Sequence, residues 1–321
     1  MSELNFTHSN GNKVKLTTPD TLAANKTFKL PGADGSAGQV LQTDGSGALS
    51  FGAAPEFMAL GGTETTYESG GTRYLVHTFT STGIFRCNLA KTVDFLIVGG
   101  GGGSPDAEGS YGSSGGGGAG GMVEGTNFSL SAGGYVVTVG AGGLKSNNTT
   151  VAGSGGDSSF AGVVAKGGGG GADYASVGGS GGSGGGGSEP NTGPGAVTQL
   201  SQNSGISNIQ QFGSDGGQGA EYTSSPTGSG GGGGAGGNGS RATATDNASN
   251  LGGAGGPGRA NSITGSSVTY AAGGRGGGAG VQNGIAGGAN TGNGASGASA
   301  SISEGSGANG GSGIVIVRYA I

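Results

Sequence analysis

The stretch Val93-Asp94-Phe95-Leu96-Ile97-Val98, followed by five glycines at 99–103, decides the fold of this chain. In an extended strand Phe95 and Ile97 point to one face, and Leu96 and Val98 point to the other. Both faces are apolar, so we predict a strand that is buried on both sides. A similar apolar run, Ile-Val-Ile-Val-Arg-Tyr, occupies 314–319 near the end of the sequence. We expect the two runs to be neighbouring strands that enclose one long glycine-rich excursion.

The composition excludes several classes of protein. Glycine supplies 87 of the 321 residues, but charged residues make up only 10% and the net charge is −5. Charge repulsion therefore does not explain the low apolar content. The glycines are clustered, without a sustained period of three, and there are only 8 prolines, so collagen is excluded. The mild acidity and the lack of a basic patch argue against a nucleic-acid partner.

Targeting, redox and metal signals are also weak. We expect no membrane insertion, because no apolar run approaches the roughly 20 residues that span a bilayer. The first residues lack the pattern of a signal peptide. Cys87 is the single cysteine and cannot form an internal disulfide, which fits folding in a reducing cytosol. His8 and His77 are too isolated for a metal cluster, so we predict neither metal nor cofactor.

Residues 1–56 form a separate compositional unit of short strands. Alternating residues predict strands at 13–16, 27–30, 39–42 and 48–51, and Asp44-Gly45 makes a tight hairpin between the last two. Such hairpins expose too much edge to be stable singly. We therefore expect this unit to associate with other copies, most simply in a trimer, or with a partner protein. Residues 54–59 read as a linker to a second unit, 57–321.

The first unit resembles a known element. Residues 28–31 (FKLP), 38–47 (GQVLQTDGSG) and 49–51 (LSF) are similar to a recurring element of bacteriophage tail-fibre proteins, especially those of marine phages. The resemblance implies that residues 1–56 attach the chain to a phage tail or another virion protein.

The second unit is predicted to be mainly β with irregular segments and little or no α-helix. Strands are expected within 73–98, with a hairpin of 73–79 and 83–89, and at 135–139, 158–164 and 314–319, enough for a small sheet or sandwich. Residues 77–79, 93–99, 137–143, 156–160 and 313–319 resemble, in this order, the glycine-rich domain family of phage fibre and other surface proteins. That resemblance covers residues 60–321.

The glycine runs need a structural explanation. Residues 166–312 contain only 12 Leu, Ile, Val or Phe, too few to offset an ordering cost of roughly 1–2 kcal/mol per residue. Either this region is a flexible linker, or backbone hydrogen bonds hold it. The second outcome is a bundle of polyglycine II helices, with three residues per turn and N–H and C=O groups pointing sideways. Runs of suitable length lie at 115–121, 167–171, 178–187, 230–237, 252–258 and 273–280. We favour the bundle.

No catalytic or nucleotide site is predicted. Residues 97–103 mimic the strand-to-glycine turn of a dinucleotide fold, but no helical pattern follows to hold a phosphate. His77 and Cys87 alternate with apolar residues and are expected to be packed. The spacing of the scattered carboxylates matches no known ion-binding loop. The carboxylates in question are Asp106, Glu108, Asp173, Glu189 and Asp215. We therefore expect no enzyme.

What remains is a binding surface. The connectors between glycine runs are polar and carry occasional aromatic residues, which are Tyr111, Tyr174, Phe212, Tyr222 and Tyr270. In a bundle these connectors collect at the two ends, and aromatics among Asn, Ser and Thr suit contact with a receptor protein or glycan. Each aromatic could equally pack beneath its own turn. The tip adhesins of some T-even-like phage fibres resemble this design.

The sequence thus leads to one main functional hypothesis and two alternatives. The main one is a virion protein, a tail-fibre or adhesin subunit that contacts a host cell-surface protein or glycan. A phage head fibre or decoration protein would use the same parts. An ice-binding or extracellular matrix protein is a third possibility, although such proteins would need a flat regular face and further cysteines.

Overall fold

The structure is a computed structural model of the chain. It describes residues 3–7, 13–17, 27, 29–107, 112–147, 150–188, 190, 192–221, 228–243, 252–278, 282–299 and 305–321. The chain divides into two compact units, Met1–Glu56 and Phe57–Ile321. The described residues contain no α-helix, and one 3-10 turn, η1 (Gln199–Ser201), is the only helical element among them. No described helix is long and apolar enough to cross a membrane.

The first unit contains two antiparallel hairpins. β1 (Glu3–Thr7) pairs with β2 (Lys13–Thr17), and β3 (Gln39–Thr43) pairs with β4 (Leu49–Ala53). The Asp44 carboxylate accepts the amides of Ser46 and Ala48 and so closes the turn of the second hairpin. The predicted strand at 27–30 contributes only a bridge from Lys29 to Ala48. No side chain described between 27 and 56 is buried, so the β3–β4 hairpin and its flanking segments have no core of their own.

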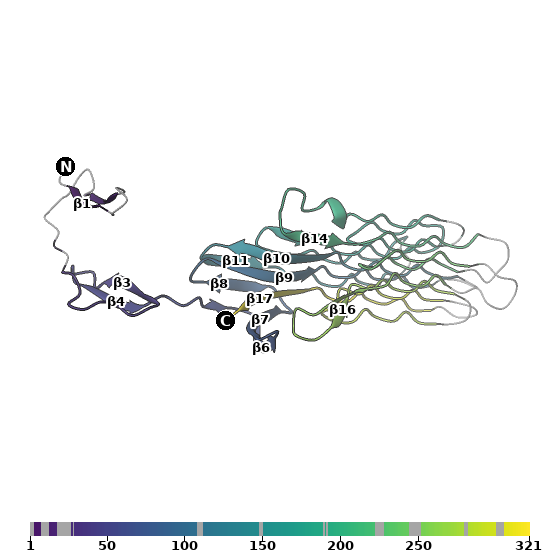
Figure 1. Ribbon diagram of the computed structural model, residues 1–321. Coiled ribbons are helices and arrows are strands. Elements are labelled where there is room, and N and C mark those ends of the chain that lie inside the picture. The colour runs from purple at the N-terminus through teal and green to yellow at the C-terminus, as the bar shows by residue number, and fades with distance from the viewer. Residues whose placement is uncertain are drawn as a thin grey trace. The chain divides into compact units, whose positions relative to one another are not determined.

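The second unit begins with two sheets. The larger has the strand order β14-β10-β9-β17-β7-β6, and the smaller has the order β11-β8-β5 (Figure 1). The larger comprises β6 (Thr63–Ser69), β7 (Thr72–Phe79), β9 (Lys91–Val98), β10 (Met122–Leu130), β14 (Ile209–Phe212) and β17 (Ile314–Ala320). The smaller comprises β5 (Ala59–Leu60), β8 (Gly83–Cys87) and β11 (Gly133–Val137). Two further hairpins are β12 (Ser158–Phe160) with β13 (Val163–Ala165), and β15 (Arg259–Asn261) with β16 (Val268–Tyr270).

The predicted pairing of the two apolar runs is confirmed. β9 and β17 are adjacent and antiparallel, with Val315 opposite Ile97 and Val317 opposite Phe95. Both strands are buried on both faces, as the sequence predicts. Phe95, Ile97 and Val315 face one core, and Leu96 and Ile316 face the other.

Two sequence predictions about strands are wrong in detail. The expected hairpin of 73–79 with 83–89 does not form, because β7 pairs with β17 and β6, whereas β8 pairs with β11 and β5. The chain instead crosses between the sheets at 80–82, so that Phe79 and Phe85 enter the same core. The expected single strand at 158–164 is a hairpin. It turns at Ala161 and Gly162, both with positive φ.

The first core, between the sheets, is rich in aromatic contacts. Phe160 meets Phe85 and Phe95 edge-on at centroid distances of 5.7 and 5.8 Å. His77 is fully buried beside Phe85, and its ring nitrogens contact the carbonyl oxygen of Gly61 and the hydroxyl of Tyr319. His77 is therefore a packed core residue, and Cys87, which is also buried, belongs to the same cluster.

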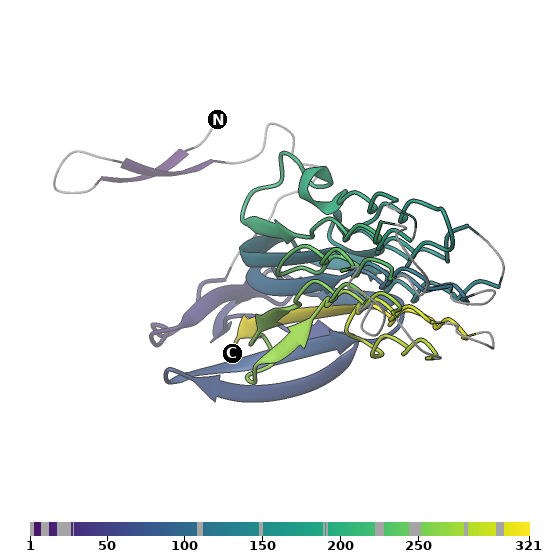
Figure 2. The same ribbon diagram turned by 90° about the vertical axis from the view of Figure 1, so that its right-hand side faces the viewer.

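Beyond the sheets the chain runs out and back repeatedly as extended segments, which we call traverses (Figures 1 and 2). They lie side by side and are joined by backbone hydrogen bonds. The traverses are 99–107, 112–121, 138–147, 150–157, 166–173, 176–182, 183–188, 192–198, 213–221, 228–234, 237–243, 252–258, 271–278, 282–288, 293–299 and 305–313.

The central traverse, 112–121, shows how they are packed. Its N–H groups donate hydrogen bonds to three neighbouring traverses in turn, so that every third residue bonds to the same traverse. From Gly115 to Gly121 the successive acceptors are Ala172, Gly230, Ala295, Gly169, Gly233, Gly292 and Lys166. Its carbonyls accept from three other neighbours, again in steps of three. These donors are Gly99 and Gly102, Ser183 and Gly186, and Gly274 and Gly277.

This pattern identifies the traverses as polyglycine II helices. Three residues per turn and laterally directed hydrogen bonds are the features of that conformation, and six hydrogen-bonded neighbours make a hexagonal bundle. Glycine is required because the helices touch through their backbones. A Cβ placed on Gly117 would lie 2.1 Å from the carbonyl oxygen of Gly102. The predicted bundle is therefore confirmed, and its interior consists of backbone.

Candidate functional site

The traverses are connected at two ends, one at the sheets and one away from them. Tyr174 lies at the end away from the sheets, in the turn between the traverses 166–173 and 176–182, and 62% of its surface is exposed. Ser188 holds this turn, since its hydroxyl donates to the Asp173 carbonyl and accepts from the Ser176 amide. Tyr174 is thus a side chain available for contact on a well-anchored turn.

Of the three predicted aromatic residues that the structure describes, Tyr174 lies apart from Phe212 and Tyr270. Phe212 and Tyr270 lie at the sheet end, in β14 and β16. Tyr270 is buried in the second core, and Phe212 is partly buried beneath the Arg259 guanidinium, 3.8 Å from the ring centroid. Both side chains therefore pack within the protein, because β14 is the edge strand of the larger sheet and Tyr270 of β16 reaches the second core. Tyr111 and Tyr222 lie outside the described residues.

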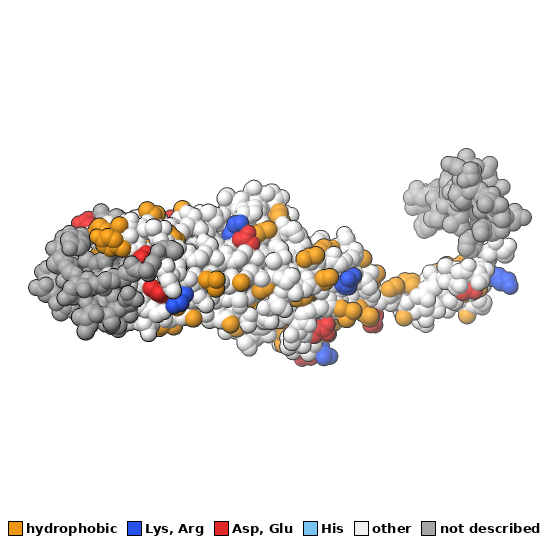
Figure 3. Space-filling model, turned by 180° about the vertical axis from the view of Figure 1, so that it is seen from behind, with side chains coloured by type: hydrophobic (Ala, Val, Ile, Leu, Met, Phe, Trp, Pro, Cys, Tyr) orange, Lys and Arg blue, Asp and Glu red, His pale blue; other side chains and the backbone are white. Residues whose placement is uncertain are grey.

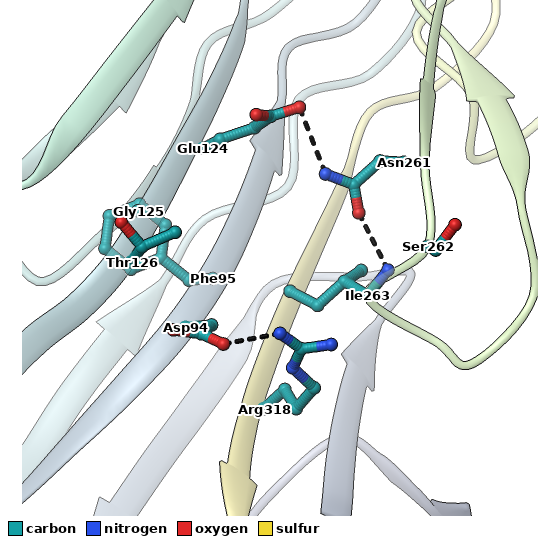
Figure 4. Close-up of a pocket in the computed structure, with 9 residues that line it drawn as sticks. All are labelled: Asp94, Phe95, Glu124, Gly125, Thr126, Asn261, Ser262, Ile263 and Arg318. Carbon is teal, nitrogen blue, oxygen red and sulfur yellow. Dashed lines mark hydrogen bonds and ion pairs between the residues drawn. The ribbon is translucent and has the colours of Figure 1, made fainter. Parts of the chain in front are cut away.

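A cleft on the face of the larger sheet collects polar side chains from distant parts of the chain (Figure 4). Its volume is about 220 Å³. One wall is the β9–β10–β17 surface, and the other is the loop that follows β15. The lining residues are Asp94, Phe95, Glu124, Gly125, Thr126, Asn261, Ser262, Ile263 and Arg318. Carboxylate, amide and guanidinium groups thus line a single cavity.

A β-bulge shapes one rim of the cleft. The pairing of β10 with β9 shifts register between Gly125 and Phe128, so Thr126 and Asn127 together lie opposite the single residue Asp94. Asn127 has a φ of 50° and donates its amide to Asp94. Bulges and left-handed residues occur frequently beside functional sites, where they redirect a strand. Here the bulge lifts Thr126 to the edge of the cavity.

Arg318 is held rigidly at the base of the cleft. It lies opposite Asp94 across β17 and β9, and its Nη2 donates to Asp94 Oδ2 at 2.5 Å. Its Nη1 donates to the Tyr67 hydroxyl, and its guanidinium lies over the Tyr74 ring. Burial disfavours the charged guanidinium, but the hydrogen bonds and the charge of Asp94 outweigh it and raise the pKa of Arg318. The guanidinium therefore keeps its charge and its orientation.

Glu124 ties the second wall to the sheet. Its Oε1 accepts from Arg259 Nε at 3.2 Å and from Asn261 Nδ2 at 3.1 Å. Asn261 Oδ1 in turn accepts the amide of Ile263, which packs into the second core. The loop after β15 is thereby fixed over the sheet. Each carboxylate of the cleft has an arginine partner, so the cavity is polar with little net charge.

Sequence reasoning missed this cleft. Asp94 stands inside an apolar run, Arg318 inside another, and Glu124 and Asn261 follow glycine runs that carry no motif. Asp94 and Arg318 as lone charges in otherwise apolar strands were the signal that could have marked it. Of the other carboxylates, Asp106 accepts the Gly307 amide and Asp215 accepts the Val197 amide. Glu108 and Glu189 lie outside the described residues. No group of three His, Cys, Asp or Glu suited to a metal ion occurs in the described part of the chain.

The comparisons with known proteins agree with this architecture. The sequence model of the glycine-rich domain family matches residues 78–320, which include the strands from the end of β7 to β17 and all of the traverses. No curated protein sequence matches the chain.

Proposed function

Because the chain belongs to the glycine-rich domain family, we propose that it is a structural virion protein of a phage, a tail-fibre or adhesin subunit that contacts the host surface. The observation that carries the proposal is the hydrogen-bonded bundle itself. A scaffold held together by backbone hydrogen bonds tolerates substitutions in its turns, because the side chains of those turns contribute little to its core. Variable turns on a stable scaffold suit a protein that must recognise a changing surface.

The surface of the bundle supports the same role. On the face shown in Figure 3, most of the described surface is backbone and side chains that are neither hydrophobic nor charged, and charged side chains are few. Contact energy must then come from a few exposed groups, and Tyr174, Leu144 and Ile285 are examples among the described residues. A single weak contact becomes a firm one when several copies bind together, since linked sites gain from a raised effective concentration.

The first unit supplies the proposed linkage between copies. Its β3–β4 hairpin has no buried side chain, and Leu41 and Phe51 are exposed. We propose that residues 1–56 associate, as a trimer, with other copies and attach the assembly to a tail or other virion protein. Assembly in the host cytoplasm fits the single unpaired cysteine, Cys87.

Labelling of bacterial cells tests the proposal. The purified chain, carrying a fluorophore, is mixed with a panel of bacterial strains, together with Tyr174→Ala and a matched control, Leu200→Ala, an exposed residue at the sheet end. We expect the parent and the control to label at least one strain, and Tyr174→Ala to label it more weakly. Labelling of no strain, combined with binding to phage heads, would favour a head fibre or decoration protein instead. Strong thermal hysteresis in ice assays would replace both with an ice-binding role.

A further inference from the structure

We propose that the cleft between the β10 bulge and the loop after β15 binds one sugar residue of a surface glycan. The biological meaning of this site rests on the host-contact function proposed above. The cleft lies beside the sheets, and its lining residues belong to β9, β10, β17 and the loop after β15. It is therefore a contact point independent of Tyr174 and the turns at the other end.

The size of the cavity limits the ligand. At about 220 Å³ it is smaller than the 300–1,000 Å³ typical of sites for drug-sized molecules. A single sugar ring with its substituents fits a cavity of this volume. Through the open side of the cavity, the rest of the glycan can extend into solvent. Gly125 and Ile263 form an apolar part of the lining for the C–H face of a ring.

The charges of the cavity select against ions. Asp94 is paired with Arg318, and Glu124 is paired with Arg259. A metal ion would have to displace an arginine from a carboxylate, and an anion would face two carboxylates. A neutral ligand meets neither cost.

The hydrogen-bonding groups suit hydroxyls. A carboxylate can accept about four hydrogen bonds. Asp94 accepts two, from the Asn127 amide and Arg318, and Glu124 accepts two, from Arg259 and Asn261. Sugar hydroxyls can donate to the remaining positions. The Asn261 amide and the hydroxyls of Thr126 and Ser262, which lie on opposite rims, can both donate and accept. Neutral polyhydroxyl compounds match this mixture best.

The site is also preorganised. Arg318 is clamped by Asp94 and Tyr67, and Asn261 is clamped by Glu124 and Ile263. Groups that are already ordered lose little freedom when a ligand binds, which improves weak affinities.

Saturation-transfer NMR on the full chain tests the site. The probes are glucose, galactose, mannose, N-acetylglucosamine and N-acetylgalactosamine at millimolar concentration. Two variants fill the cleft from opposite rims, Ser262→Phe and Thr126→Phe, and both positions are exposed. Ser267→Phe, exposed on the same loop but outside the cleft, is the matched control. We expect a saturable signal with at least one sugar, about tenfold weaker in both filled variants and unchanged in the control.

Several results would overturn the site. These are no saturable signal with any sugar, a signal that survives in both filled variants whose melting is unchanged, or displacement of the sugar by calcium chloride or inorganic phosphate. The two proposals fail separately. Sugar binding without labelling of any cell would keep the site and reject the adhesin role. Labelling of cells without sugar binding would keep the adhesin role and reject the sugar site.

Discussion

The amide nitrogen of Gly117 lies 2.8 Å from the carbonyl oxygen of Ala295, and one helical turn later Gly120 bonds in the same way to Gly292. These contacts join segments that are far apart in the sequence, and no side chain takes part in them. The register of the bundle is therefore set by backbone groups repeating every three residues.

Substitution at Gly117 should destabilise the protein strongly. In Gly117→Ala the new methyl group would lie 2.1 Å from the backbone oxygen of Gly102, which cannot move without breaking its own hydrogen bonds. We expect a loss of about 1–3 kcal/mol or more in the free energy of unfolding. Gly193→Ala is the matched control, since a Cβ there meets nothing within 4 Å. Thermal and denaturant melts monitored by circular dichroism compare them, and equal stability of the two variants would contradict the packing described.

A buried hydroxyl should matter more than an exposed one. Ser104 is fully buried, and its Oγ accepts the amide of Ala308 at 2.9 Å and donates to the carbonyl of Ser296 at 2.7 Å. Ser104→Ala leaves both groups without this partner, at a cost of about 1–3 kcal/mol. The exposed Ser154→Ala should change stability by less than about 0.5 kcal/mol. Chemical denaturation measures both, and a neutral Ser104→Ala would show that the hydroxyl is dispensable.

The cross-strand pair of Arg318 and Asp94 should show energetic coupling. Both side chains are about three-quarters buried, so either single change leaves a partly buried charge without its partner. We expect Arg318→Met and Asp94→Asn each to lower stability, and the double variant to lose less than the sum of the two. A double-mutant cycle should give a coupling of about 0.5–3 kcal/mol. Additive losses would mean that the pair contributes no net interaction.

Alkaline pH should destabilise the protein through Tyr319. Burial, with a smaller contribution from the charge of Glu64, raises the pKa of this phenol to about 12. In the unfolded chain it titrates near 10. Between these values the unfolded state has released the proton and the folded state has not. Stability is therefore complete below pH 10 and falls by about 1.4 kcal/mol per pH unit as the pH rises towards 12.

The test of this alkaline loss is Tyr319→Phe, which removes the titrating group. Its stability should depend less steeply on pH between 10 and 12 than that of the parent. Burial also raises the pKa of Tyr270, so Tyr270→Phe should flatten the profile as well. An unchanged profile in Tyr319→Phe would contradict the assignment.

The second unit should fold without the first. Phe57 packs edge-on against Tyr319 at 4.7 Å, and both hydrophobic cores lie within 57–321. We expect the fragment 57–321 to melt cooperatively at the temperature of the parent, with a spectrum of polyproline II type. In analytical ultracentrifugation the fragment should be monomeric and the full chain larger. A monomeric full chain would reject the proposed trimer.

Much of the fold could be predicted from local patterns. The doubly apolar runs at 93–98 and 314–319 have a single plausible environment, the interior of a sheet between two cores. The long glycine runs, interrupted every third residue by serine at 178–184, exclude a side-chain core and favour polyglycine II. By contrast, the partners of β7 and β8 could not be predicted. Their short linker permits a hairpin, and only the placement of Phe79 and Phe85 in one core decides otherwise.

The cleft could not be predicted from sequence for a related reason. Asp94, Glu124, Asn261 and Arg318 meet only after β9, β10 and β17 have paired and the loop after β15 has folded back over them. The aromatic residues of the connectors were equally ambiguous in sequence. Tyr174 is exposed and Tyr270 buried, because one lies in a turn away from the sheets and the other against the sheet.

The sequence by itself determined which groups form the interior of the protein. They are apolar side chains at the strands and backbone groups at the glycine runs. The sequence did so because burial on both faces and the absence of Cβ are local properties of the residues. Only the tertiary structure decided which traverse lies beside which, and hence where the cleft opens. Backbone hydrogen bonds are chemically alike along every glycine run, so the choice of neighbour depends on the sheets and turns that hold the ends of each traverse.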